Sequence, residues 1–135
     1  LQKLIHEKKL QDNVFLLGSI TEQEKYSLLT YSKVFIMPNH TRNQNDIEGF
    51  GISFVEAQFF ENAVIAGKSG GVVESVSENQ TGYLIDFEKD NPRQQISICL
   101  SELFSNLSKV HDMGKKGKKY VLENFEINTL AEKVR

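Results

Sequence analysis

Four short apolar runs separated by helical patterns constrain the fold more than any other feature of this sequence. The runs occupy residues 14–17, 34–37, 64–66 and 83–85. Each has the length of a strand, and none alternates cleanly between polar and apolar residues, as is typical of strands buried on both faces of a sheet. Strands that alternate with helices over short connections form a parallel sheet covered by helices on both faces. The sequence therefore predicts the α/β class with a Rossmann-like, doubly wound parallel sheet.

Helical patterns fill the segments between these runs. Thr21 and Glu24 have the spacing of a capping box, and an apolar face follows them, formed by Tyr26, Leu28 and Leu29. Residues 50–60 predict a further helix, and residues 72–76 predict a shorter one. The sheet and these helices together resemble one half of a doubly wound fold.

The chain after Pro92 is helical in pattern throughout. Its apolar residues recur at helical spacing, first as Ile96, Leu100, Leu103, Phe104 and Leu107, and then as Val110, Met113, Tyr120 and Val121. A last segment from Asn128 places Leu130 and Val134 four residues apart. We therefore expect C-terminal helices after the sheet, with residues 1–135 forming one domain and no internal linker.

Composition excludes several classes of protein. The 135 residues suit one domain, and 39% hydrophobic and 25% charged residues are ordinary for a globular chain. A net charge of −2 argues against nucleic-acid binding. The single Cys99 forms no intramolecular disulfide and supplies no metal cluster. No apolar run approaches the roughly 20 residues of a membrane span and no signal peptide opens the chain, so we expect a soluble, cytoplasmic protein.

The N-terminus lies inside a helical pattern. The sequence begins at Leu1 rather than at methionine, and Leu1, Leu4 and Ile5 already recur at helical spacing. We therefore expect this chain to be part of a longer protein.

The longest polar segment follows the second predicted strand. It covers residues 38–48 and leads through Gly49, Phe50 and Gly51 into the next predicted helix. Ligands of open α/β sheets bind outside the carboxyl ends of the strands, and the N-terminus of a helix there favours phosphate. A second glycine-bearing loop, residues 67–71, follows the next predicted strand. Two such loops at adjacent strand ends predict a phosphate-binding crevice.

Two glutamates flank the start of the helix over residues 50–60. Glu48 precedes the helix, and Glu56 lies about 7.5 Å further along its axis, if the helix begins near Gly51. Because helical side chains lean toward the N-terminus, the Glu56 carboxylate can point back to the crevice. Two carboxylates around a phosphate-binding helix end suit a ligand with hydroxyls at both ends of a diphosphate, as in a nucleotide sugar.

Residues 48–57, EGFGISFVEA, resemble the E-x7-E motif of retaining glycosyltransferases of the GT-B fold, especially glycosyltransferase family 4. The resemblance continues in register through residues 64–74 and the turn and strand at 82–85, and upstream through residues 14–18 and 34–38. It covers nearly the whole chain. The resemblance identifies the chain as the donor-binding C-terminal domain of such an enzyme, truncated at its N-terminus.

The resemblance implies transfer from a nucleotide-diphosphate sugar to a glycan or lipid-linked acceptor, with retention at the anomeric carbon and without metal or other cofactor. It assigns Glu48 to the hydroxyls of the donor sugar, as the catalytic residue, and Glu56 to the ribose hydroxyls. It assigns the remaining donor contacts to backbone groups, at the base or at the sugar and phosphates: Gly18, Ser19, Gly49, Phe50, Gly51 and Ile52. Bacterial polysaccharide or glycolipid assembly is the common setting of the family.

Two parts of the family pattern are missing from this sequence. A basic pair that grips the diphosphate and the acceptor-binding N-terminal domain would both precede Leu1. We therefore expect this chain alone to bind donor weakly and not to turn over. A nucleotide-sugar epimerase of the GT-B fold and a non-catalytic nucleotide-binding module remain alternatives.

Simpler interpretations apply to several of these residues. Glu48 can be a loop carboxylate, Glu56 an exposed helix glutamate, and the glycines plain turn residues. His40 and Arg42 suit a solvated loop. A basic run near the C-terminus comprises Lys115, Lys116, Lys118 and Lys119. Such a run can contact the anionic inner face of a membrane, but it is more typical of a solvated helix face.

Overall fold

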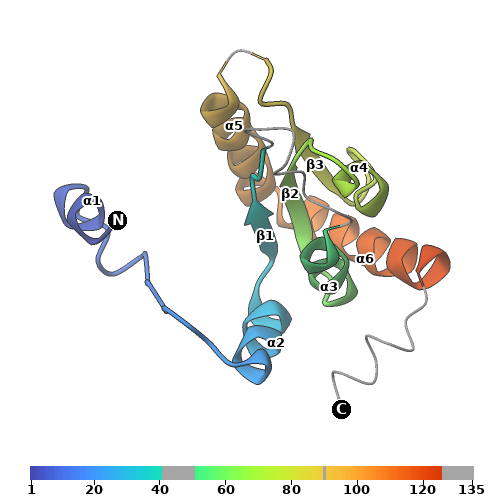
Figure 1. Cartoon of the computed structure of the whole chain (residues 1–135), viewed down its shortest axis with the longest axis horizontal. Coiled ribbons are helices and arrows are strands. Elements are labelled where there is room, and N and C mark those ends of the chain that lie inside the picture. The colour runs from blue at the N-terminus through green and yellow to red at the C-terminus, as the bar shows by residue number, and fades with distance from the viewer. Residues whose placement is uncertain (41–50, 90, 126–135) are drawn as a thin grey trace.

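The computed structural model describes residues 1–40, 51–89 and 91–125. Its sheet consists of β1 (Val34–Met37), β2 (Ala63–Gly67) and β3 (Gly82–Ile85). The helices of these ranges are α1 (Gln2–Glu7), α2 (Glu22–Tyr31), α3 (Ile52–Phe59), α4 (Val72–Ser75), α5 (Pro92–Ser105) and α6 (Leu107–Asn124). Figure 1 shows the helices grouped around the sheet, with α1 standing apart from the rest.

The three strands form a parallel sheet in the order β1-β2-β3. Val34 pairs with Ala63 across β1 and β2, and Ile65 pairs with Tyr83 across β2 and β3. The parallel sheet and three of the four strands expected from the sequence are therefore confirmed. Because the strands are parallel, their carboxyl ends meet at one edge.

Both faces of the sheet are covered, and β2 is buried along its whole length. Val64 and Ala66 pack on one face with buried side chains of α2, α3 and α4. Ala63 and Ile65 face the other way, into a second cluster with α5 and α6. Successive side chains of a strand point to opposite faces, so a strand buried on both sides needs the continuous apolar run that the sequence has. The predicted α/β architecture with helices on both faces is confirmed.

Helix α2 begins as its sequence predicts. Thr21 Oγ1 accepts a hydrogen bond from the backbone N–H of Glu24, and Glu24 Oε2 accepts from the backbone N–H of Thr21, 2.7 Å away. Tyr26 and Leu29 of the expected apolar face are buried, but Leu28 is 43% exposed and does not share their burial. Successive helical residues differ by about 100° in direction, and here Leu29 faces the core while Leu28 points away from it.

The C-terminal helices are confirmed as α5 and α6, which pack on the sheet through Leu103, Val110 and Met113. Phe104 and Leu107 were expected on the same apolar faces, yet both are exposed. Phe104 follows the buried Leu103 directly and so points away from the sheet. The segment expected from Asn128 lies outside the described residues.

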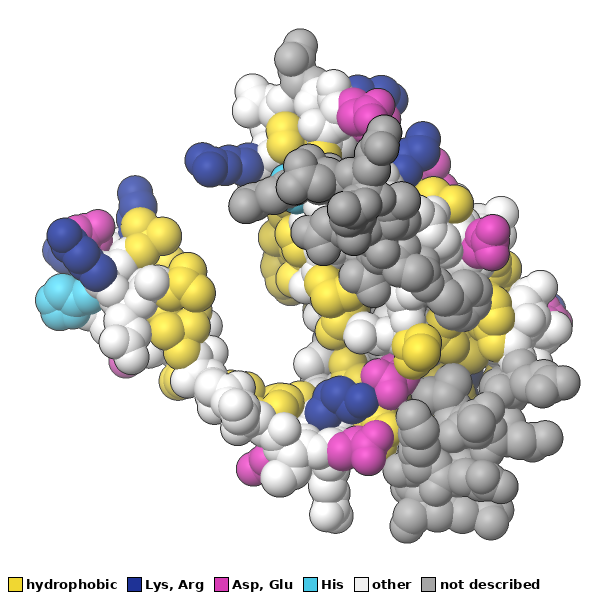
Figure 2. All heavy atoms as spheres, viewed as in Figure 1, with side chains coloured by type: hydrophobic (Ala, Val, Ile, Leu, Met, Phe, Trp, Pro, Cys, Tyr) yellow, Lys and Arg dark blue, Asp and Glu magenta, His cyan; other side chains and the backbone are white. Residues whose placement is uncertain are grey.

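The strand expected at residues 14–17 is wrong, because these residues form no regular element. Among the described residues, β1 pairs with β2 alone, and no strand lies beside 14–17. A strand without a neighbour loses its ladder of hydrogen bonds. Phe15 is 71% exposed, and the segment runs between α1 and α2 away from the sheet (Figure 1). Figure 2 shows hydrophobic side chains on the side of this N-terminal part that faces the rest of the molecule.

Candidate functional site

The structure describes five of the eight site residues expected from the sequence. Gly51, Ile52 and Glu56 lie at or in α3, and Gly18 and Ser19 precede α2. The other three lie outside the described residues: Glu48, Gly49 and Phe50. The described part of the site is therefore the beginning of α3, the loops at the carboxyl edge of the sheet, and the start of α2.

Loops meet closely at the carboxyl edge of the sheet. The side-chain Oδ1 of Asn39, just after β1, accepts a hydrogen bond of 3.3 Å from the backbone N–H of Gly67 at the end of β2. A Cβ atom at Gly67 would lie 1.5 Å from the carbonyl oxygen of Asn39, so only glycine fits there. The exposed His40 ring stacks on Phe87, which follows β3, at 4.7 Å between centroids. Contacts between side chains and backbone therefore join the ends of all three strands.

Gly51 is the N-cap of α3 and has a positive φ of 73°. A Cβ atom at this position would lie 2.7 Å from Cδ2 of Phe54, so both the backbone conformation and the space require glycine. Phe54 is fully buried, and its ring meets Phe35 of β1 edge to face at 5.9 Å. This packing fixes the N-terminus of α3 on the sheet.

The first turn of α3 has the properties of an anion site. The first backbone N–H groups of a helix have no partner within the helix and carry the positive end of its dipole. Ile52, the first residue of α3, is exposed. The Ile52 end of α3 is therefore accessible from outside.

Glu56 lies in the second turn of α3 and is buried, at 6% exposure. Its two carboxylate oxygens each accept a hydrogen bond of 3.0 Å from Nζ of Lys25 in α2. The alternative that Glu56 is an exposed helix glutamate is therefore wrong. A carboxylate with so little contact with water requires a compensating charge, which Lys25 supplies.

Tyr26 lies beside this ion pair. Its hydroxyl donates a 2.8 Å hydrogen bond to Glu22, its ring stacks on Phe60, and Nζ of Lys25 lies 4.7 Å from the ring centroid. Burial, followed by the hydrogen bond to Glu22 and the charge of Glu56, raises the pKa of Tyr26 to about 12. The neutral phenol is thus part of the packing between α2 and α3.

Stability at high pH should depend on Tyr26. Its pKa is raised above the ordinary value of 10, so the stabilisation is complete below pH 10 and is lost as the pH rises toward 12. We expect the free energy of unfolding to fall more steeply with pH in the wild type than in Tyr26→Phe over this range. Urea unfolding at pH 9, 10 and 11 measures the difference. Equal slopes for the two proteins would contradict a raised pKa at this tyrosine.

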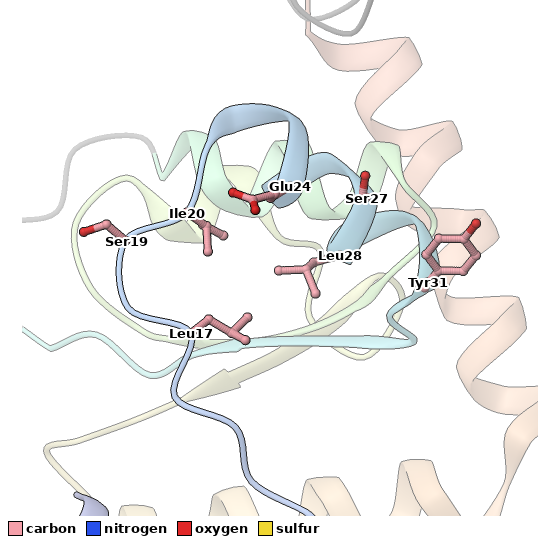
Figure 3. Close-up of a pocket in the computed structure, with 7 residues that line it drawn as sticks. All are labelled: Leu17, Ser19, Ile20, Glu24, Ser27, Leu28 and Tyr31. Carbon is pink, nitrogen blue, oxygen red and sulfur yellow. The ribbon is translucent and has the colours of Figure 1, made fainter.

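Gly18 and Ser19 lie at the start of α2. Gly18 has a φ of 67° with open space around it. Ser19 lines a groove of about 400 Å³ between the N-terminal segment and one face of α2, shown in Figure 3, together with Leu17, Ile20, Glu24, Ser27, Leu28 and Tyr31. The α2 members of this lining recur at helical spacing, whereas Lys25 and Tyr26 face α3. The groove and the Glu56 carboxylate therefore lie on different faces of α2.

The second glycine loop leads into only one turn of helix. Gly70 has a φ of 52°, and α4 spans four residues. Such a short helix has little macrodipole, so α4 contributes less to an anion site than the sequence suggested. Gln58 of α3 donates a 2.7 Å hydrogen bond to the carbonyl of Ser75, which holds α4 against α3.

A scan against protein-family models matches residues 1–120 to the family described as glycosyl transferases group 1. The chain belongs to this family. A GDP-mannose-dependent alpha-(1-6)-phosphatidylinositol monomannoside mannosyltransferase from Mycobacterium tuberculosis is 33% identical over 135 residues, which cover 99% of this chain and 34% of that protein. The chain spans about a third of the length of the curated relatives it matches.

Solved structures, one of them from a group 1 glycosyl transferase, share the fold. The C-terminal domain of a group 1 family protein from Francisella tularensis matches with a TM-score of 0.79 at 24% identity, over 94% of this chain and 61% of that one. Anabaena Alr3699/HepE, solved in complex with UDP, matches with a TM-score of 0.76 at 19% identity, over 98% of this chain and 34% of that one. The expected resemblance to GT-B glycosyltransferases is confirmed.

Sequence reasoning missed Lys25 as the partner of Glu56. Lys25 and Glu56 are 31 residues apart, and no local pattern predicts that α2 lies against α3.

No cluster of three or more metal-ligating side chains occurs within the described ranges. Within the same ranges, no helix combines the length and apolar character needed to cross a membrane.

Proposed function

We propose that this chain is the part of a glycosyltransferase that binds a nucleotide-diphosphate sugar. The observation that carries the proposal is Glu56, a buried carboxylate in the second turn of α3, whose first turn lies beside the carboxyl edge of a parallel sheet. Membership of the group 1 family and the E-x7-E spacing with Glu48 support it. In open α/β sheets this edge is where nucleotides bind.

Each end of the donor has a proposed set of contacts. The Glu56 carboxylate accepts hydrogen bonds from the ribose hydroxyls, and Glu48 accepts them from the hydroxyls of the sugar. Backbone N–H groups contact the sugar and phosphates at Gly49, Phe50, Gly51 and Ile52, and the backbone of Gly18 and Ser19 borders the base. The positive end of α3 favours the diphosphate.

The proposed reaction is metal-independent transfer with retention. The bond between the anomeric carbon and the diphosphate oxygen breaks, and a bond to the acceptor oxygen forms on the same face of the sugar, while the acceptor's hydroxyl proton passes to the departing diphosphate. Negative charge grows on the departing diphosphate, so donors already oriented toward it stabilise the transition state. Backbone N–H groups at the start of α3 are such donors, because packing of Phe54 against Gly51 holds the helix in place.

The relatives suggest which donors to test first. The mycobacterial relative is named as GDP-mannose-dependent with a phosphatidylinositol monomannoside acceptor, and the Anabaena structure holds UDP. We propose a glycan or lipid-linked acceptor, bound by sequence beyond the third of the relatives that this chain spans. The proposed setting is cytoplasmic, at the inner face of the membrane.

A second proposal is membrane contact through α6. Lys118 pairs with Glu61 at 2.9 Å and Lys119 lies 3.7 Å from Glu123. These partners offset part of the positive charge of the run at 115–119, so any attraction to anionic lipid rests on its remaining lysines.

Calorimetric titration of the chain with ADP, GDP and UDP tests the proposed donor site. We expect one of the three to bind best, and Glu56→Ala to weaken it about tenfold or more, as expected for loss of hydrogen bonds to a charged group. Glu123→Ala, which removes an exposed carboxylate of α6, is the matched control and should leave the dissociation constant of the nucleotide unchanged. Binding should persist in EDTA. Absence of binding, or equal binding by Glu56→Ala, would contradict the proposed site.

A further inference from the structure

The Lys25–Glu56 pair connects α2 to the proposed donor site and has geometry beyond that of a surface ion pair. Nζ of Lys25 lies 3.0 Å from each carboxylate oxygen of Glu56, so the ammonium bridges both. The Glu56 side chain is 8% exposed and that of Lys25 is 36% exposed. The pair therefore lies at the boundary between the core and the surface.

The ammonium of Lys25 is itself held in place. It lies 4.7 Å from the ring centroid of Tyr26, within the range of a cation–π contact. The Tyr26 ring is fixed in turn by stacking on Phe60 and by the hydrogen bond of its hydroxyl to Glu22. Because that hydroxyl donates to Glu22, its proton is not available to Glu56. Lys25 is thus the group that orients the Glu56 carboxylate from α2.

The bridge leaves acceptor capacity on Glu56. An ionised carboxylate has about four lone-pair positions on its two oxygens, and Lys25 uses one on each oxygen. Counted over the described residues, one position on each oxygen remains for a hydroxyl donor. A carboxylate already ionised and held in one rotamer can accept such a bond without the cost of ordering its side chain.

We propose that Lys25 is a positioning residue that makes Glu56 selective for a nucleotide with an intact ribose diol over its 2′-deoxy counterpart. The inference rests on the proposed function, in which Glu56 accepts from the ribose. Without Lys25 the carboxylate has no fixed direction and no compensating charge, so the hydroxyl loses its oriented acceptor. Lys25 acts through Glu56, and its effect is on selectivity between the two sugars.

The test compares each ribonucleoside diphosphate with its 2′-deoxy form: UDP with dUDP, GDP with dGDP, and ADP with dADP. The readout is the ratio of the two dissociation constants for the base that binds best. We expect the wild type to prefer the ribonucleotide about tenfold, the value of one hydrogen bond to a charged group. This ratio is insensitive to partial unfolding, because a fraction of unfolded protein lowers the apparent affinity for both nucleotides by the same factor.

Five variants separate a positioning role of Lys25 from general damage to the fold. Lys25→Met should reduce the ratio to near that of Glu56→Gln, and Lys25→Arg should retain most of it. The double variant Lys25→Met/Glu56→Gln should have the same ratio as Glu56→Gln alone. Both substitutions remove the same interaction, so the second has nothing further to remove. Lys119→Met removes an exposed lysine of α6 and should leave the wild-type ratio.

The outcomes distinguish the two proposals. A wild type that binds none of the nucleotides overturns the proposed function and the inference with it. A wild type that binds a nucleotide without preferring ribose leaves nucleotide binding standing and overturns the inference. If Lys25→Met keeps the wild-type ratio, the positioning role of Lys25 is overturned, while nucleotide binding and the preference for ribose stand.

Discussion

Phe54→Ala should lower the free energy of unfolding by about 3–5 kcal/mol, the usual cost of truncating a buried phenylalanine. Phe54 is 0% exposed, packs edge to face on Phe35 of β1, and lies directly against Gly51 at the start of α3. The truncation leaves a cavity between α3 and the sheet at the point where the candidate site begins. Urea unfolding followed by circular dichroism measures the loss.

Phe104→Ala is the matched control for this cavity, because it removes the same side chain from a position 64% exposed on α5. We expect a change within about 0.5 kcal/mol, as for most surface substitutions. Similar losses from Phe54→Ala and Phe104→Ala would mean that Phe54 does not anchor α3 to the sheet.

Gly67→Ala is expected to destabilise the chain by about 3 kcal/mol, at the upper end of the cost of overpacking. Gly67 ends β2, and a Cβ atom there would lie 1.5 Å from the carbonyl oxygen of Asn39 and 3.0 Å from its backbone nitrogen. Both atoms belong to the backbone, so they can move away only if the ends of β1 and β2 separate. The hydrogen bond from Gly67 to Asn39 would be lost in the same movement. Thermal and urea unfolding measure this effect.

Gly18→Ala is the control for Gly67→Ala, because it replaces a glycine at a position where the added Cβ atom meets no other atom. Gly18 has a positive φ but nothing within 4 Å of its Cβ position, so the expected cost is about 1 kcal/mol from the backbone conformation alone. If Gly67→Ala lowers the free energy of unfolding no more than Gly18→Ala does, the backbone of Asn39 does not lie as close to Gly67 as the structure shows.

The parts of the fold that followed from the sequence depend on local signals. Continuous apolar runs marked β1, β2 and β3 because strands covered on both faces have no polar side to interrupt them. The capping box at Thr21 marked the start of α2 because both of its hydrogen bonds form within four residues.

The errors arose where a partner from elsewhere decides the structure. Residues 14–17 have the composition of a strand, but a strand requires a neighbour, and none pairs with them in the described part of the chain. Leu28 and Phe104 each follow or precede a buried leucine, and only the packing of α2 and α5 determines which of the two faces the core.

The candidate site was predictable in part. The position of Glu56 one turn inside α3 followed from the spacing of the motif, and Gly51 was expected at the turn. The bridge from Lys25 was not predictable, because it depends on how α2 packs against α3 across 31 residues of sequence. Glu48, Gly49 and Phe50 lie outside the described residues, so their assigned roles stay predictions.

We propose that a nucleoside diphosphate binds where the N-terminus of α3 meets the carboxyl edge of the sheet. Amide chemical-shift mapping of isotope-labelled chain during titration with ADP, GDP and UDP tests it most directly. We expect one nucleotide to shift the amides of residues 51–53 and Glu56 most, and Glu56→Ala to weaken these shifts. Shifts confined to other surfaces, such as the N-terminal segment with α1 or the outer face of α6, would contradict it, as would the absence of shifts with all three.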